Sequence, residues 1–127
     1  MRYLLDTHVL FWWITNDARL SPQHKALIAS SGNEIYVSAV SAWEMAVKFK
    51  IGKWPEVGPL LPDVTAKVIA EGFLPLDITL QQAERAGLLD LVHRDPFDRV
   101  LAAQALDLQI AVLTVDPALR LLGCDLV

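Results

Sequence analysis

The chain alternates short, continuously apolar segments with longer segments of helical character, and this alternation restricts its fold more than any other feature. The apolar segments have strand length, and they lack the polar alternation of a strand with one wet face. Strands buried on both faces belong to parallel sheets that are covered by helices on either side. The sequence therefore predicts an α/β fold, namely a three-layer α/β/α sandwich with a mainly parallel central sheet.

Turn and cap residues set the expected boundaries. Ser21-Pro22 and Asp95-Pro96 each place a favoured N-cap before a proline at the first helical position, and Pro75 suits an edge strand. The expected strands span 2–5, 34–37, 73–76, 110–113 and 124–127. The expected helices span 8–14, 22–30, 38 or 41 to 51, 60–71, 79–91 and 95–108, with a short last helix opened by Asp116-Pro117 and a loop at 52–59.

Composition narrows the class of protein. The chain has 127 residues, 54% hydrophobic and 20% charged, which suits one folded domain over residues 1–127 and argues against disorder. No apolar run reaches the ~20 residues of a membrane helix, and MRYLLDTHVL is a poor signal peptide. A single cysteine, Cys124, excludes an internal disulfide and a thiolate cluster within one chain. We expect a cytoplasmic protein.

The net charge of −4 opposes binding of nucleic acid by bulk electrostatics. A chain of this charge that acts on a phosphate-bearing substrate needs a divalent metal or a local basic patch. Its high apolar content also suggests a surface that a partner covers.

Two aspartates follow expected strands directly. Asp6 directly follows the first strand, in LLDTHVLFWW, and Asp116 follows the strand AVLTV in the same manner. Parallel strands would bring both to the edge where such sheets bind ligands. Each aspartate alone could equally be an N-cap that complements the helix dipole.

Glu44 lies inside the expected helix SAVSAWEMAVKFKIG. We expect the apolar face of that helix to consist of Val40, Trp43, Val47 and Ile51, with Glu44 at its border. The alternative role for Glu44 is an i,i+4 ion pair with Lys48 at the surface.

The segment DPFDR supplies two more acids, Asp95 and Asp98, three residues apart at a helix start. Asp95 suffices as the N-cap, so Asp98 is free for another role. VLAAQAL follows, so we expect Asp98 to be partly buried. The alternative is that Asp98 only complements the helix dipole.

Acids on four segments that converge at one sheet edge would repel each other and raise each other's pKa unless a cation lies among them. Oxygen ligands without cysteine suit Mg²⁺ or Mn²⁺. Such an ion, held by Asp6, Glu44, Asp98 and Asp116, could polarise a phosphoryl oxygen and supply an activated water. This constellation therefore suggests phosphodiester hydrolysis.

Other constellations are weak. The three histidines lack metal-ligand spacing, no G-x-S-x-G elbow is present, and no glycine-rich phosphate loop occurs. The four tryptophans suit a core or an interface. Trp12 and Trp13 point in different directions on a helix, so one of them could face a partner.

Four motifs, LLDTHVLFWW, SAVSAWEMAVKFKIGK, DPFDRVLAAQAL and VLTVDPAL, resemble in order and spacing the PIN-domain ribonucleases. More specifically, they resemble the VapC-type toxins of toxin–antitoxin pairs, and the similarity covers nearly the whole chain.

The resemblance implies a metal-dependent endoribonuclease whose Mg²⁺ or Mn²⁺ ligands correspond to Asp6, Glu44, Asp98 and Asp116. It also implies RNA as substrate, a homodimer, and a cognate antitoxin whose tail fills the site. The auxiliary candidates are Thr7 and Thr114, which could orient water or metal, Asp95 as cap with a supporting role, and Arg99, which could contact substrate phosphate or form a salt bridge.

Two other readings stay open. The first is a non-catalytic module of the same fold that binds only a metal or a partner. The second is a receiver-type signalling domain, which also gathers acids around Mg²⁺ but requires a lysine after a late strand. All five lysines here lie at or before position 67, which disfavours that reading.

Overall fold

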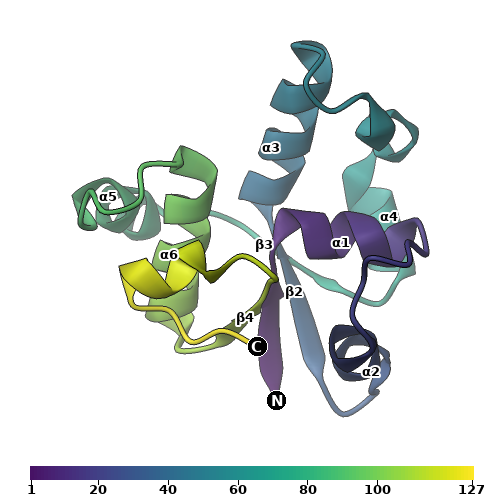
Figure 1. Ribbon diagram of the computed structural model, residues 1–127, viewed down its shortest axis with the longest axis horizontal. Helices are drawn as coiled ribbons and strands as arrows, with labels where there is room; N and C mark the ends of the chain where they lie inside the picture. The colour runs from purple at the N-terminus through teal and green to yellow at the C-terminus, as the bar shows by residue number, and fades with distance from the viewer.

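The structure is a computed structural model that describes residues 1–127 (Figure 1). Its strands are β1 (Arg2–Leu5), β2 (Glu34–Ser38), β3 (Leu74–Leu76) and β4 (Ala111–Leu113). Its α-helices are α1 (Thr7–Ile14), α2 (Pro22–Ala29), α3 (Ala39–Lys50), α4 (Val64–Ala70), α5 (Leu80–Leu88) and α6 (Pro96–Leu108), and two 3₁₀ helices are η1 (Pro55–Leu60) and η2 (Pro117–Leu122).

The four strands form one parallel sheet in the order β3-β2-β1-β4. Tyr3 in β1 lies opposite Ile35 in β2 and Ala111 in β4. Because all strands run the same way, their carboxyl ends share one edge, where α1 and α3 begin (Figure 1). The parallel sheet and the edge position of β3 confirm the predicted fold class.

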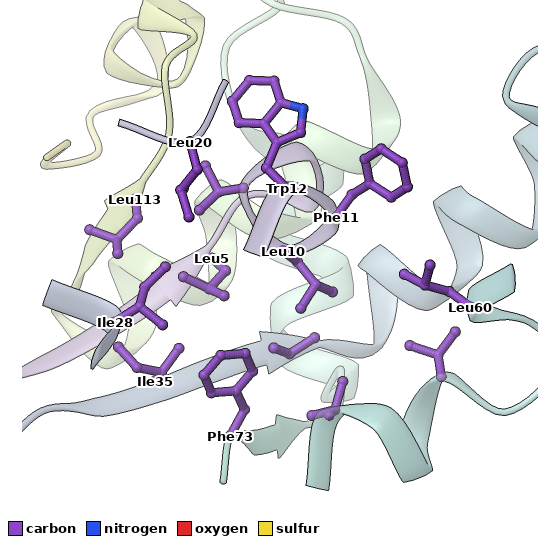
Figure 2. Close-up of a cluster of buried hydrophobic side chains, with 14 of the residues drawn as sticks. Leu5, Leu10, Phe11, Trp12, Leu20, Ile28, Ile35, Leu60, Phe73 and Leu113 are labelled. Carbon is purple, nitrogen blue, oxygen red and sulfur yellow. The ribbon is translucent and has the colours of Figure 1, made fainter. Parts of the chain in front are cut away.

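Helices cover both faces of the sheet. Tyr3 and Leu5 pack with α1, α2 and α4 in one buried cluster, part of which Figure 2 shows around Leu10, Ile28 and Phe73. Leu4, between them in sequence, packs on the opposite face with α6 and η2. Successive side chains of a strand point to opposite faces, so a strand covered on both sides is apolar throughout.

Several predicted boundaries are wrong. Residues 124–127 form no strand: η2 extends to Leu122, and only Leu126 makes an isolated bridge, to Val112. The helix expected over 60–71 begins at Val64, because the Asp63 side chain caps it through the Ala66 N–H. The expected loop 52–59 contains most of η1, and α5 ends at Leu88 rather than at 91.

The expected apolar face of α3 is wrong at two of its four positions, whereas Val40 is buried and Val47 is partly buried as expected. Trp43 and Ile51 are 54% and 59% exposed, whereas Glu44 is buried. The buried side of α3 consists of Val40, Ser41, Glu44 and Met45. A hydrogen bond of 2.9 Å between Ser41 Oγ and Thr7 Oγ1 fixes this orientation, so a polar strip of α3 faces the sheet edge.

None of the helices combines the length and the apolarity that a bilayer crossing requires.

Candidate functional site

The four acids singled out in the sequence line one cavity of about 250 Å³ at the carboxyl edge of the sheet. Asp6 and Asp116 follow β1 and β4, Glu44 projects from α3, and Asp98 lies in the first turn of α6. The other lining residues are His8, Trp12, Lys48, Asp95 and Val115. The structure thus brings all four candidate acids together.

Asp6 is fixed on both carboxylate oxygens. The Thr7 N–H donates to Oδ1 over 2.7 Å, so Asp6 is also the N-cap of α1, and the Thr114 hydroxyl donates to Oδ2 over 2.6 Å. Burial raises the pKa of Asp6, and the charge of Glu44 adds to this effect. The two hydrogen bonds and His8 oppose it only in part. The site therefore has too little positive charge for this carboxylate.

Glu44 and Lys48 form an ion pair inside the cavity, with Nζ 2.5 Å from Oε2. Burial alone would lower the pKa of Lys48. The hydrogen bond and charge of Glu44, together with the charges of Asp95 and Asp98, outweigh this effect, so the pKa of Lys48 is raised. The predicted i,i+4 pair therefore exists. It does not exclude a site role for Glu44, because the pair lines the cavity and is not on an open surface.

Asp98 accepts a 2.8 Å hydrogen bond from Nε2 of His93. Burial raises the pKa of Asp98 to about 6, and although His93 opposes the shift, the charges of Asp6 and Asp95 add to it. Asp95 caps α6 through the N–H groups of Phe97 and Asp98. Asp98 is therefore available for another role, and it is partly buried as expected.

Asp116 is exposed and caps η2 through the Ala118 N–H. Its own N–H donates to the Thr114 hydroxyl over 3.0 Å. Thr114 therefore touches both acids that follow strands, whereas Thr7 uses its hydroxyl to contact Ser41.

The role expected for Arg99 is wrong. Its side chain is buried, and its two terminal nitrogens donate to the carbonyl groups of Gly87, Leu89, Asp90 and His93. It makes no salt bridge. Arg99 holds the segment between α5 and α6 in place.

Three aromatic or titratable residues at the site were not predicted from the sequence. His8 and Trp12 line the cavity, and His93 binds Asp98. His8 could have been found from its position two residues after Asp6, in the first turn of α1. The contact of His93 depends on the loop before α6, and no sequence spacing indicates it.

The donor chemistry of the cavity fits a hard divalent cation. Four carboxylates offer oxygen ligands, and the raised pKa values of Asp6 and Asp98 show that added positive charge would be favourable there. No three His, Cys, Asp or Glu side chains lie close enough together to hold an ion in this arrangement. Lys48 and His93 engage Glu44 and Asp98 instead.

A parallel sheet between two helical layers, with carboxylates gathered at its carboxyl edge, defines the architecture that the sequence motifs implied. The chain belongs to the PIN domain family, whose family model matches residues 3–123. Comparison with curated proteins finds no match in sequence.

Solved structures share this fold. A chain of VapBC2 from Rickettsia felis, bound to a promoter DNA fragment, superposes with a TM-score of 0.71 at 16% identity, covering 100% of this chain and 98% of that one. A chain of DNA-bound VapBC from Salmonella typhimurium gives a TM-score of 0.70 at 16% identity, with 100% and 97% covered. A chain of DNA-bound FitAB gives 0.66 at 16% identity, with 98% and 93% covered.

Proposed function

We propose that this chain is a Mg²⁺- or Mn²⁺-dependent endoribonuclease that hydrolyses RNA phosphodiesters as the toxin of a toxin–antitoxin pair. The observation that carries the proposal is the cavity shared by Asp6, Glu44, Asp98 and Asp116 in a PIN domain. We also propose that residues 1–127 form one domain and that the protein works in the cytoplasm.

In this proposal the four acids hold the ion. A bound ion would supply positive charge at the phosphate and would lower the pKa of a water molecule. Thr114 and the Thr7 N–H fix the direction of the Asp6 carboxylate. Asp95 holds the first turn of α6, and with it Asp98. The water oxygen bonds to phosphorus as the ester oxygen leaves, so no covalent intermediate forms on the protein.

We further propose a cognate antitoxin and a homodimer. The structural relatives are chains of VapBC and FitAB, and the present chain exposes several large apolar side chains. Leu88, Leu91, Val92 and Leu121 are each more than half exposed, which suits a surface that another chain covers. Light scattering of the purified chain tests the dimer, and co-purification with the product of a neighbouring gene tests the antitoxin.

Two observations favour a second candidate, the non-catalytic module of the same fold. No three candidate ligands are gathered around one point, and Lys48 already partners Glu44. A chain that binds Mn²⁺ or a partner but leaves RNA intact would fit this candidate.

The deciding experiment is incubation of total cellular RNA with the purified chain in Mn²⁺, in Mg²⁺ and in chelator. Asp98→Asn is tested beside it, with Glu84→Gln, an exposed acid on α5 outside the cavity, as the matched control. Discrete fragments that need metal, vanish in Asp98→Asn and persist in Glu84→Gln support the ribonuclease. Intact RNA together with saturable Mn²⁺ binding favours the non-catalytic module.

A further inference from the structure

The ring of His8 is exposed on the wall of the acidic cavity and lies flat against Trp54. The two ring centroids are 4.5 Å apart, and the planes differ by 21°. His8 belongs to the first turn of α1, whereas Trp54 belongs to the loop after α3. One face of the imidazole is therefore covered, and the stack borders the carboxylates.

The position of Trp54 is fixed independently of His8. The backbone N–H of Trp54 donates to the backbone carbonyl of Lys48 over 3.1 Å, and Pro55 begins η1 directly after it. Phe11 contacts it edge-on, with centroids 5.2 Å apart and planes at 66°. The stack is thus formed before any ligand binds, so a ligand that used it would order few side chains.

Without a bound cation, the protein's own charge opposes RNA at this cavity. The chain carries a net charge of −4, and carboxylates dominate the polar lining. A contact that does not rely on phosphate attraction would offset this repulsion. Stacking of a base on an aromatic ring is such a contact, and it tolerates every base because each has a π-face.

We propose that the His8–Trp54 stack receives one nucleobase of single-stranded RNA beside the phosphodiester that the acids address. This inference rests on the proposed ribonuclease function. It specifies the substrate as unpaired RNA, because bases inside a duplex are already stacked on both faces, whereas loops and ends can present theirs. His8 is then a substrate-contacting residue.

The test measures binding without catalysis. Two fluorescent decamers with equal numbers of phosphates are used, oligoadenylate and an abasic ribose-phosphate chain. Fluorescence anisotropy in chelator gives the Kd of each for Asp98→Asn, alone and combined with His8→Ala or His8→Phe. His8→Ala removes the ring on which a base could stack, whereas His8→Phe keeps an aromatic ring at that position.

We expect His8→Ala to weaken oligoadenylate binding by about 5- to 20-fold, at the lower end of the range for one stacked base. Binding of the abasic decamer should not change. Trp43→Ala is the matched control, since Trp43 is also an exposed aromatic side chain but lies outside the cavity; it should leave both Kd values unchanged. Trp54→Leu should reproduce the His8→Ala result.

Equal Kd values for the two decamers, or an equal loss for both in His8→Ala, would overturn the stacking proposal. Metal-dependent cleavage of total RNA by the otherwise unmodified chain is measured in parallel. Cleavage with no base-dependent binding rejects the stack alone and leaves the ribonuclease standing. Base-dependent binding that His8→Ala abolishes, in a chain that cleaves no RNA, supports the stack and rejects the nuclease.

Discussion

The hydroxyl group of Thr114 donates a 2.6 Å hydrogen bond to Oδ2 of Asp6 and accepts one of 3.0 Å from the N–H of Asp116. Thr114 is buried just after β4, and Asp6 follows the neighbouring strand β1. A single side chain therefore sets the relative positions of two of the four acids.

Thr114→Val keeps the shape of the side chain and removes both hydrogen bonds. We expect the free energy of unfolding to fall by about 1–2 kcal/mol. Cleavage should fall roughly 10- to 100-fold, the usual cost of losing a group that orients a metal ligand. Urea unfolding and RNA cleavage measure the two effects. Thr114→Ser, which keeps the hydroxyl, should retain most of both; a valine variant with wild-type cleavage would show that Thr114 does not orient Asp6.

The contact between Thr114 and Asp6 marks the limit of what the sequence could predict. Asp6 and Asp116 were found because acids that directly follow buried parallel strands must meet at one edge of the sheet. Thr114 was an auxiliary candidate from the sequence, but its hydrogen bond to Asp6 could not be predicted, because the two residues lie 108 positions apart. Only the pairing of β1 with β4 brings the two together.

Two positions on the face of α3 were predicted wrongly for a related reason. Periodicity alone placed Trp43 and Ile51 inside, on the assumption that apolar side chains mark the buried face. Contacts of α3 with α1 and α6 turn Ser41 and Glu44 inward instead. Contacts with other helices override the apolar periodicity of a single helix. Such exceptions are most expected at a functional site, where polar side chains are buried.

The raised pKa of Asp98 predicts a pH-dependent stability. At about pH 2.5 and below, the carboxyl group is protonated in both states and contributes nothing. As the pH rises toward 6, the unfolded chain loses this proton first, since the folded pKa is about 6. The contribution of Asp98 to stability therefore becomes more unfavourable over that window and is constant above it.

Asp98→Asn removes this penalty. In chelator at pH 7.5 the variant should be more stable than the wild type by about 1–2 kcal/mol, allowing for partial screening by solvent. At about pH 2.5 the two should be nearly equal. Urea midpoints between about pH 2.5 and 7.5 measure the difference. Glu84→Gln should show no such trend, and a constant gap for Asp98→Asn at every pH would exclude ionisation as the cause.

Arg99 is expected to stabilise the fold rather than to bind RNA. Arg99→Met removes the donors of four hydrogen bonds at partly buried carbonyl groups, so the free energy of unfolding should fall by about 2–4 kcal/mol. Arg99→Lys should recover less than half, because an ammonium group lacks the planar fork of the guanidinium. Arg94→Met, at an exposed neighbouring site, should change little in the same urea titration. Unchanged stability in Arg99→Met would restore a substrate role for this arginine.

Lys48 partners Glu44 at the place where a metal ligand is proposed, so the two roles of Glu44 compete. In chelator, Lys48→Met leaves Glu44 buried without its cation. Because Lys48 is itself partly exposed, we expect a loss of about 1–3 kcal/mol. Added Mn²⁺ should stabilise this variant more than the wild type, since Glu44 is then free to bind the ion and the gain grows with affinity. Thermal unfolding with and without Mn²⁺ measures both effects.

The reference variants separate this competition from a general change in charge. Lys50→Met removes the same charge from an exposed position on the same helix, and its response to Mn²⁺ should equal that of the wild type. Glu44→Gln combined with Lys48→Met should lose the extra response, because the amide cannot supply the missing negative charge. If Lys48→Met responds to Mn²⁺ no more than the wild type does, Glu44 is not a ligand, and the ion would have to be held by Asp6, Asp98 and Asp116 alone.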